Sequence, residues 1–243
     1  MEKRTLILDV DQTLASGVVP AHMTLYNERL DLKMTTEEIE KTHRFPKTFD
    51  VPQIIEHRGK GKEQEDEFQR VRAEIRTSES VHLALIELPG SVGGVLNLLN
   101  NDSQIIFGGY YSVRPTEVES ATRQWLKMKN FPNPENVIIC EDPKGKLTRI
   151  INNHLGINAN GSNVILIDDS LKELTEAAKT MVSEDPNKRK AMERLIVVGF
   201  GQTESKRAEL EGSFYPQTGL RTLALPSWHT DNISGLKRAL LIN

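Results

Sequence analysis

The stretch TLILDVDQTL, residues 5–14, decides the fold, because an apolar run typical of a buried strand ends there in two carboxylates. Side chains alternate along an extended chain, so Asp9, Asp11 and Thr13 are expected to point the same way. Two like charges held close together repel each other unless a positive group lies between them. We therefore expect a metal ion and a phosphate group beside this segment. A turn after the strand is the alternative, since aspartate is common in turns.

The composition predicts one large domain, or one domain with an insertion, in a chain of 243 residues. The net charge of −3 argues against a dedicated nucleic-acid-binding protein, so no nucleic-acid partner is expected. The single cysteine, Cys140, cannot form a disulfide within the chain, which fits a soluble protein of the cytoplasm or another reducing compartment. No apolar run reaches the length of about 18 residues that a membrane span requires, and no signal peptide is predicted.

Further apolar runs predict strands at residues 104–111, 136–140, 164–167, 195–198 and 222–225. Helical spacing of apolar residues lies between most of them, at residues 91–101, 116–129, 146–155 and 171–181, and a last helix is expected from about Ile233. This alternation predicts an α/β fold, a three-layer Rossmann-like parallel sheet with helices on both faces. Residues 199–217 are polar and are expected to form a loop.

Local signals refine the helix ends and faces. Thr116 with Glu119, and Ser170 with Glu173, have the spacing of capping boxes, in which each side chain satisfies a free backbone N–H. Met128 falls on the apolar face of the helix predicted at residues 116–129 and is expected to be buried.

The segment between Leu14 and Pro89 interrupts the alternation of strands and helices. It contains the charged tract EHRGKGKEQEDEFQRVRAEIR, in which Phe68, Val71 and Ile75 are spaced as one face of a helix. An insertion after the first strand overhangs the carboxyl ends of the strands, where open α/β sheets bind ligands. We interpret residues 15–88 as a helical cap on a core formed by residues 1–14 and 89–243. A solvated helical excursion without contact to the site is the alternative.

Polar side chains follow four of the predicted strands at their carboxyl ends. Carboxylates suit Mg²⁺, which prefers oxygen ligands, and the histidines show no zinc spacing such as HExxH. The serine fits equally well as the start of a turn, and the lysines as loop charges. The residues are Asp9 and Asp11, Ser112, Lys144 and Lys146, and Asp168 and Asp169.

Together these motifs resemble the haloacid dehalogenase superfamily, whose phosphatases carry DxDx[T/V], a serine or threonine at a strand end, a lysine and an acidic pair. The corresponding stretches here are DVDQT, the serine of YYSVRP, a lysine of PKGK, and IDDS. The likeness covers residues 4–14 and about 104–170. One departure is the pair Gly108–Gly109, since the family often runs a tight apolar strand straight into its serine or threonine.

The resemblance implies a Mg²⁺-dependent phosphoric monoester hydrolase that works through an aspartyl-phosphate. Asp9 would be the nucleophile, and Asp11 would protonate the leaving oxygen and then activate water. Lys146 is favoured over Lys144 because it opens a predicted helix. The positive end of the helix macrodipole disfavours a lysine there unless an anion lies in front of it. The implied metal ligands are Asp9, Asp11 through its backbone carbonyl, Asp168 and Asp169, and the implied phosphate ligands are Thr13, Ser112 and Lys146 or Lys144.

The substrate is predicted by likeness alone. The DxDxT and DDS motifs look like those of relatives that act on phosphoproteins, so a phosphotyrosine or phosphoserine protein is one hypothesis. A sugar or nucleotide phosphate is the alternative. A phosphotransferase, or a module that binds phosphorylated partners without turnover, would use the same residues.

Overall fold

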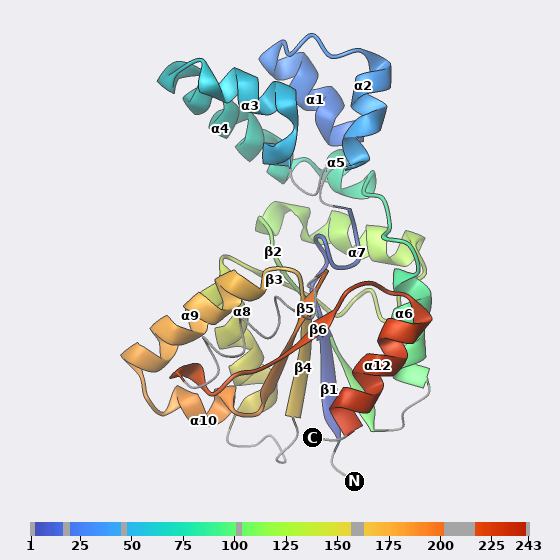
Figure 1. The fold of residues 1–243 in the computed structure, drawn as a ribbon, viewed down its shortest axis with the longest axis vertical. Coiled ribbons are helices and arrows are strands. Elements are labelled where there is room, and N and C mark those ends of the chain that lie inside the picture. Colours follow the sequence, from blue (N-terminus) through green and yellow to red (C-terminus); the bar gives the residue numbers. More distant parts are fainter. Residues whose placement is uncertain are drawn as a thin grey trace.

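The centre of the protein is a six-stranded parallel sheet with the order β3-β2-β1-β4-β5-β6 (Figure 1). The structure is a computed structural model and describes residues 3–16, 20–44, 48–100, 104–156, 163–201 and 217–241. The predicted α/β class, a Rossmann-like parallel sheet, is confirmed. Each strand coincides with a predicted apolar run: β1 Arg4–Leu8, β2 Ile105–Val113, β3 Val137–Cys140, β4 Asn163–Asp168, β5 Leu195–Phe200 and β6 Arg221–Leu225.

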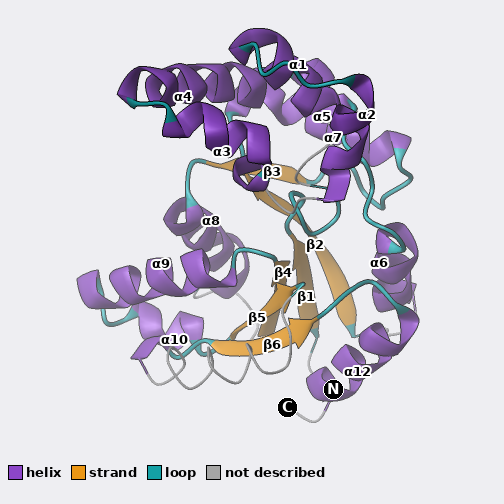
Figure 2. Ribbon diagram, turned by 45° about the horizontal axis from the view of Figure 1, so that its top comes forward, coloured by secondary structure: helices purple, strands orange, loops and turns teal. Residues whose placement is uncertain are grey.

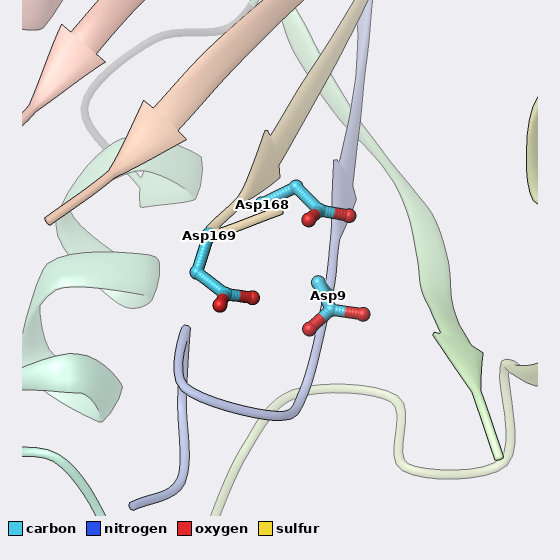
Figure 3. A group of neighbouring side chains, drawn as sticks. All are labelled: Asp9, Asp168 and Asp169. Atoms are coloured by element: carbon cyan, nitrogen blue, oxygen red, sulfur yellow. The ribbon is translucent and has the colours of Figure 1, made fainter. Parts of the chain in front are cut away.

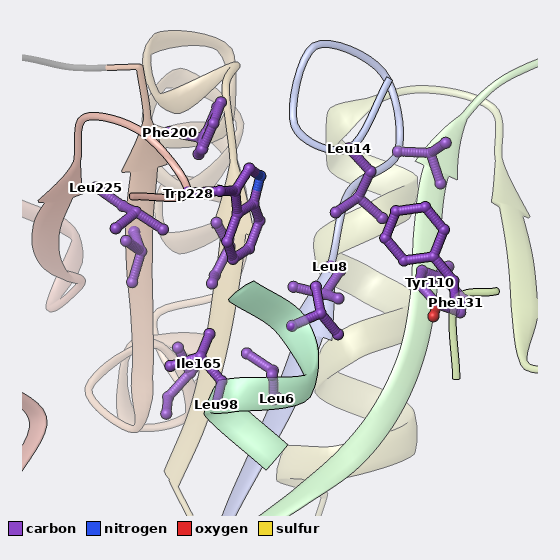
Figure 4. Packing of buried hydrophobic residues seen from close by; sticks show 14 of the residues in the cluster. Leu6, Leu8, Leu14, Leu98, Tyr110, Phe131, Ile165, Phe200, Leu225 and Trp228 are labelled. Carbon is purple, nitrogen blue, oxygen red and sulfur yellow. The ribbon is translucent and has the colours of Figure 1, made fainter. Parts of the chain in front are cut away.

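Successive side chains on the strands enter two hydrophobic cores, one on each face of the sheet. On β1, Leu6 and Leu8 belong to one core and Ile7 belongs to the other. Figure 4 shows the first core, in which the ring of Trp228 stacks on Phe200 with 5.4 Å between the ring centroids. Burial on both faces explains why the strands are continuous apolar runs, and each fully buried aliphatic side chain contributes about 1.5–3 kcal/mol.

Helices cover both faces of the sheet and so make the three layers that the sequence predicts (Figure 2). The helices that complete the first core are α6 (Ser91–Asn100), α7 (Glu119–Met128) and α12 (Thr230–Leu241). Those that complete the second are α8 (Pro143–Ile150), α9 (Leu171–Glu184) and α10 (Lys188–Met192). Within the described ranges, no helix combines the length and apolar character needed to cross a bilayer.

Several local predictions differ from the structure. The capping box of Thr116 and Glu119 is wrong, because a 3-10 turn, η3 (Thr116–Val118), precedes α7 and the Thr116 hydroxyl contacts Glu117. Met128 is exposed rather than buried, since it lies at the last turn of α7 beyond the face that packs on the core. The loop predicted at residues 199–217 starts later than expected, because β5 continues to residue 200, and residues 202–216 lie outside the described residues.

Helix α8 begins one turn earlier than predicted. Asp142 is its N-cap, and the Asp142 carboxylate accepts a hydrogen bond of 2.6 Å from the Gly145 N–H. Lys146 therefore lies inside the first turn rather than at the start. The helix continues as a single π-helical turn, η4 (Ile151–Leu155), before the chain leaves it at Gly156.

The glycine pair that departs from the family pattern forms a β-bulge. The register between β1 and β2 shifts between Leu6 and Ile7, at the level of Gly108. Gly109 has a φ of +120°, which L side chains rarely adopt, and a Cβ added to Gly108 would lie 2.4 Å from a side chain of β1. The extra residue shifts the alternation of side chains between the two faces of the sheet for the rest of β2, and so contributes to the position of Ser112.

The insertion after β1 is helical and has a hydrophobic core of its own. We call it the helical cap; its helices are α1 (Pro20–Leu30), α2 (Thr36–Glu40), η1 (Lys41–Arg44), η2 (Thr48–Asp50), α3 (Pro52–Gly59), α4 (Lys62–Thr77) and α5 (Glu79–Leu83). Phe68, Val71 and Ile75 of α4 lie in that core, as their helical spacing predicts. In Figure 1 the cap lies beyond the carboxyl ends of the strands, joined to them through α5.

Two connections link the helical cap to the core, and they pair with each other. The Ser16 N–H donates to the Ile86 carbonyl at 2.7 Å. The indole N–H of Trp125, in α7, donates to the Leu85 carbonyl at 2.8 Å and fixes the returning connection to the core. The cap is therefore held over the sheet at the edge where the polar residues lie.

Candidate active site

A pocket of about 190 Å³ lies at the carboxyl ends of β1, β2 and β4. From β1 the chain continues to β2 on one side of the sheet, and from β4 it continues to β5 on the opposite side. The strand order therefore reverses between β1 and β4, and the pocket lies at the carboxyl ends of these two strands. We call it the carboxylate pocket. The predicted site residues that line it are Asp9, Asp11, Ser112, Lys146, Asp168 and Asp169.

Three carboxylates converge in this pocket (Figure 3). One oxygen from each of Asp9, Asp168 and Asp169 lies within 4.8 Å of the others. Burial raises the pKa of Asp9 well above its usual value, and the neighbouring carboxylates raise it further. Burial and the charge of Asp168 likewise raise the pKa of Asp169 to about 7. A cluster of oxygen ligands with unbalanced negative charge fits Mg²⁺.

Lys146 lies between two of these carboxylates and is 2% exposed. Its Nζ donates to Asp9 Oδ1 at 2.6 Å and to Asp168 Oδ2 at 2.5 Å. Burial opposes the charged form of the lysine, but Asp168 and Asp9 outweigh burial and raise its pKa above the usual value. Lys144 lies at the surface, where it pairs with Glu184 at 2.7 Å. The structure thus brings Lys146, and not Lys144, into the pocket.

Asp168 and Asp169 have different surroundings although they are adjacent. Both oxygens of Asp168 are occupied, one by Lys146 and the other by the backbone N–H of Ser170 at 2.7 Å. Among the residues that the structure describes, the Asp169 carboxylate receives one hydrogen bond, of 3.3 Å, from the Ser170 hydroxyl. Asp169 therefore has more capacity to bind a metal. The predicted capping box of Ser170 with Glu173 is wrong, because the Ser170 side chain caps no backbone N–H.

Asp11 is bound by an arginine that the sequence analysis did not identify. Arg114 Nε donates to Asp11 Oδ2 at 2.7 Å and Nη2 to Oδ1 at 2.6 Å, while Nη1 donates to the Thr122 hydroxyl at 2.7 Å. Burial raises the pKa of Asp11, but the charge and hydrogen bonds of Arg114 outweigh it and lower the pKa to about 2. The Asp11 side chain is still 39% exposed, so a ligand can reach it.

Ser112 lies beside Asp11, with its hydroxyl 3.3 Å from Asp11 Oδ2. Ser112 and Arg114 are two residues apart at the end of β2, and side chains with this spacing lie on the same side of an extended chain. The spacing in SVRP was therefore a signal for Arg114, provided that Ser112 was already assigned to the site.

Thr13 does not reach the carboxylate pocket. It is fully buried, and its carbonyl accepts a hydrogen bond of 2.6 Å from the Trp228 indole. The prediction assumed an extended chain through residue 13, but Gln12 has a φ of +55° and turns the backbone. Gln12 itself lines the pocket in place of Thr13.

No family model and no curated protein matches the chain. A HAD-superfamily hydrolase from Ehrlichia chaffeensis is 15% identical, with 100% of each chain covered and a TM-score of 0.50. A haloacid dehalogenase-like protein from Agrobacterium tumefaciens (12%, 98% of each chain, TM-score 0.49) and a HAD family hydrolase from Deinococcus radiodurans (12%, 98% and 95%, TM-score 0.48) also align.

The first of these likenesses shows the fold. The described part of the chain has the α/β fold of a haloacid dehalogenase superfamily hydrolase. The residues described above supply the chemistry from which a function is inferred.

Proposed function

We propose that the chain belongs to the haloacid dehalogenase superfamily and hydrolyses phosphomonoesters with Asp9 as the nucleophile. The observation that carries this proposal is the buried contact of Lys146 with Asp9 and Asp168, next to Asp169. Such a contact holds an anionic nucleophile in one orientation and leaves its second oxygen for attack. A purely structural ion pair would need no third carboxylate within the same 4.8 Å.

A divalent cation fits the carboxylate pocket, because the donor set consists of oxygens and carries excess negative charge. Asp9 and Asp169 would hold it, with the backbone carbonyl of Asp11 as a further ligand. When bound, Mg²⁺ screens the repulsion between a phosphate dianion and an anionic nucleophile. Asp168 is the positioning residue for Lys146 in this proposal.

In the first step, a carboxylate oxygen of Asp9 forms a bond to phosphorus and the bond from phosphorus to the leaving oxygen breaks. Asp11 gives its proton to that oxygen. In the second step, water attacks phosphorus, Asp11 takes the proton, and the Asp9 carboxylate is released. Ser112 and Lys146 hold the phosphate oxygens through hydrogen bonds.

The Arg114 contact separates the two tasks of Asp11. An Asp11 carboxylate with a pKa of about 2 is ionised at neutral pH, as a base in the second step should be. Donating a proton in the first step requires that Asp11 first give up its hydrogen bonds to Arg114 and take up a proton from solvent, which it then passes to the leaving oxygen. We therefore propose that the described arrangement is the resting state of the site.

The test is release of phosphate from p-nitrophenyl phosphate, with Mg²⁺ or with EDTA. The Asp9→Asn variant is expected to lose at least about 10³-fold in kcat/KM, and EDTA should abolish activity. Asp66→Asn, an exposed change on α4, is the control and should leave the rate unchanged. Equal rates for Asp9→Asn and the parent protein would disprove the assignment of the nucleophile.

The predictions about substrate and turnover need separate measurements. Panels of phosphopeptides and of metabolite phosphates distinguish a phosphoprotein phosphatase from a metabolite phosphatase. Transfer of phosphate to an added alcohol in place of water would support a phosphotransferase. Tight binding of phosphorylated ligands with no phosphate release would support a binding module.

A further inference from the structure

A second cavity, of about 390 Å³, lies between the core and the helical cap. We call it the cap pocket. It shares Asp11, Gln12, Val113 and Ser170 with the carboxylate pocket, so the two are continuous around Asp11. Its remaining walls come largely from the cap, including α4 and the turn η2.

The position of the cap pocket relates it to the leaving group. In the proposed reaction Asp11 protonates the leaving oxygen, so the leaving group extends from phosphorus on the Asp11 side. The cap pocket is the cavity on that side. Its volume lies within the range of about 300–1,000 Å³ that is usual for small-molecule sites.

Two arginines of α4 give the cap pocket a positive charge. Arg72 and Arg76 both line it and are one helical turn apart, which places them side by side on the helix. Neither forms an ion pair with a carboxylate in the part of the chain that the structure describes. By contrast, Arg29, Arg58 and Arg70 of the cap each pair with a glutamate.

The other titratable groups of the cap pocket do not offset this charge. Asp11 is the only carboxylate among the described lining residues, and Arg114 neutralises it. Burial lowers the pKa of His22 to about 4 and also lowers that of His82, so both imidazoles are neutral at pH 7. Burial raises the pKa of Tyr26 to about 12, so its phenol is neutral as well.

The Phe49 ring forms a flat wall of the cap pocket and contacts Arg72. The guanidinium of Arg72 lies 4.9 Å from the centroid of the Phe49 ring, and Arg58 lies 4.9 Å from the same ring. Arg58 is fixed by Glu65 at 2.6 Å and lies outside the pocket lining, whereas Arg72 is left to meet a ligand. Tyr26 stacks on Phe68 with 5.6 Å between centroids and forms a second wall.

We propose that the cap pocket selects small phosphomonoesters whose leaving group carries a second anionic group, which Arg72 and Arg76 bind. The inference rests on the proposed phosphatase function and specifies its substrate class. A guanidinium without a carboxylate partner binds carboxylate or phosphate through paired hydrogen bonds. The second anion is therefore a carboxylate or a second phosphate.

The experiment compares two matched pairs of substrates. Phosphoglycolate against ethyl phosphate tests a carboxylate, and glucose 1,6-bisphosphate against glucose 1-phosphate tests a second phosphate. In at least one pair the anionic member should have the higher kcat/KM by about 10²-fold or more, because hydrogen bonds between charged groups are stronger than those between neutral groups. The Arg72→Gln/Arg76→Gln variant should reduce that ratio to below about 5.

The control is Arg70→Gln, on the same helix but outside the cap pocket, which should keep the full preference. An unchanged preference in the double variant, no preference in either pair, or a preference for phosphopeptides would each overturn the proposal. If the parent protein hydrolyses no ester at all, the phosphatase function fails. In that case calorimetry measures the binding of the same esters. Tighter binding of the anionic member of a pair, lost in the Arg72→Gln/Arg76→Gln variant, would support an anion site. Equal binding of both members would refute it.

Discussion

The carboxylate pocket and the cap pocket are adjacent but are built in opposite ways. The first takes buried side chains from the ends of parallel strands, and its cation, Lys146, is fixed between two carboxylates. The second takes Arg72, half-buried, and Arg76, exposed, from a helix whose apolar face packs in a separate core. The difference fits the two proposals above, in which the sheet holds the catalytic residues and the cap selects the substrate. Changes in the two pockets should therefore have separable effects.

The largest effect is expected from Lys146→Met. The change leaves Asp9 and Asp168 buried without their cation, so we expect loss of activity by at least about 10³-fold and of about 3–5 kcal/mol in the free energy of unfolding. Lys144→Met removes an exposed ion pair with Glu184 and should change stability by less than about 1 kcal/mol. Urea unfolding and phosphatase assays measure both, and similar losses for the two lysines would contradict the assignment.

The next effect concerns the boundary between the pockets. Arg114→Gln frees Asp11 and removes the charge that lowers its pKa, so the pKa of Asp11 should rise from about 2 toward the usual value. We expect kcat/KM to fall by about 10–100-fold because Asp11 is no longer positioned. The acid limb of the pH–rate profile should move to higher pH, and Arg114→Lys should restore its original position in part. A fall in rate with no change in profile would mean that Arg114 has a structural role alone.

A smaller effect is expected from the bulge that precedes Ser112. Gly109→Ala puts a Cβ 2.7 Å from the Asn136 carbonyl at a φ of +120°, which should lower the free energy of unfolding by about 1–3 kcal/mol. Gly93→Ala, in α6, meets no atom within 4 Å and should be neutral or stabilising by up to about 1 kcal/mol. Chemical denaturation measures the stability of both variants. No loss of stability in Gly109→Ala would contradict the claim that the bulge requires glycine at this position.

The smallest effect is the pH dependence of metal binding. The pKa of Asp169 is raised to about 7 in the folded protein without metal, above its value of about 3.8 when unfolded, so this group lowers stability as pH rises from about 4 to 7. Mg²⁺ binds the ionised carboxylate and should raise Tm more at pH 8 than at pH 5. Calorimetric scans of the parent protein and of Asp169→Asn test this, and an equal Mg²⁺ shift at both pH values would count against Asp169 as a ligand.

Much of the fold could be predicted from the sequence because buried parallel strands are continuous apolar runs. The six strands followed from that pattern, and the helical insertion followed from the helical spacing of Phe68, Val71 and Ile75. The failures have a common cause, which is local backbone geometry. The positive φ at Gln12 removed Thr13 from the pocket, and cap contacts at Asp142 and Ser170 differed from those implied by residue spacing.

The candidate site was predictable where short motifs at the strand ends supplied its residues. The acidic motifs placed Asp9, Asp168 and Asp169 at adjacent strand ends, and the structure brings them together. Arg114 was not identified because its partner, Asp11, is 103 residues away in the chain. The positive charge of the cap pocket could not be predicted either, because the sequence does not show which arginines of α4 form ion pairs with glutamates and which do not.

Phosphorylation of Asp9 is the most direct test of the central claim. The protein is mixed with Mg²⁺ and p-nitrophenyl phosphate, quenched in acid and reduced with borohydride, which converts an aspartyl-phosphate to homoserine, and its peptides are then analysed by mass spectrometry. We predict homoserine at position 9, absent without substrate. Turnover with no modified Asp9, or with the modification at another residue, would contradict the account.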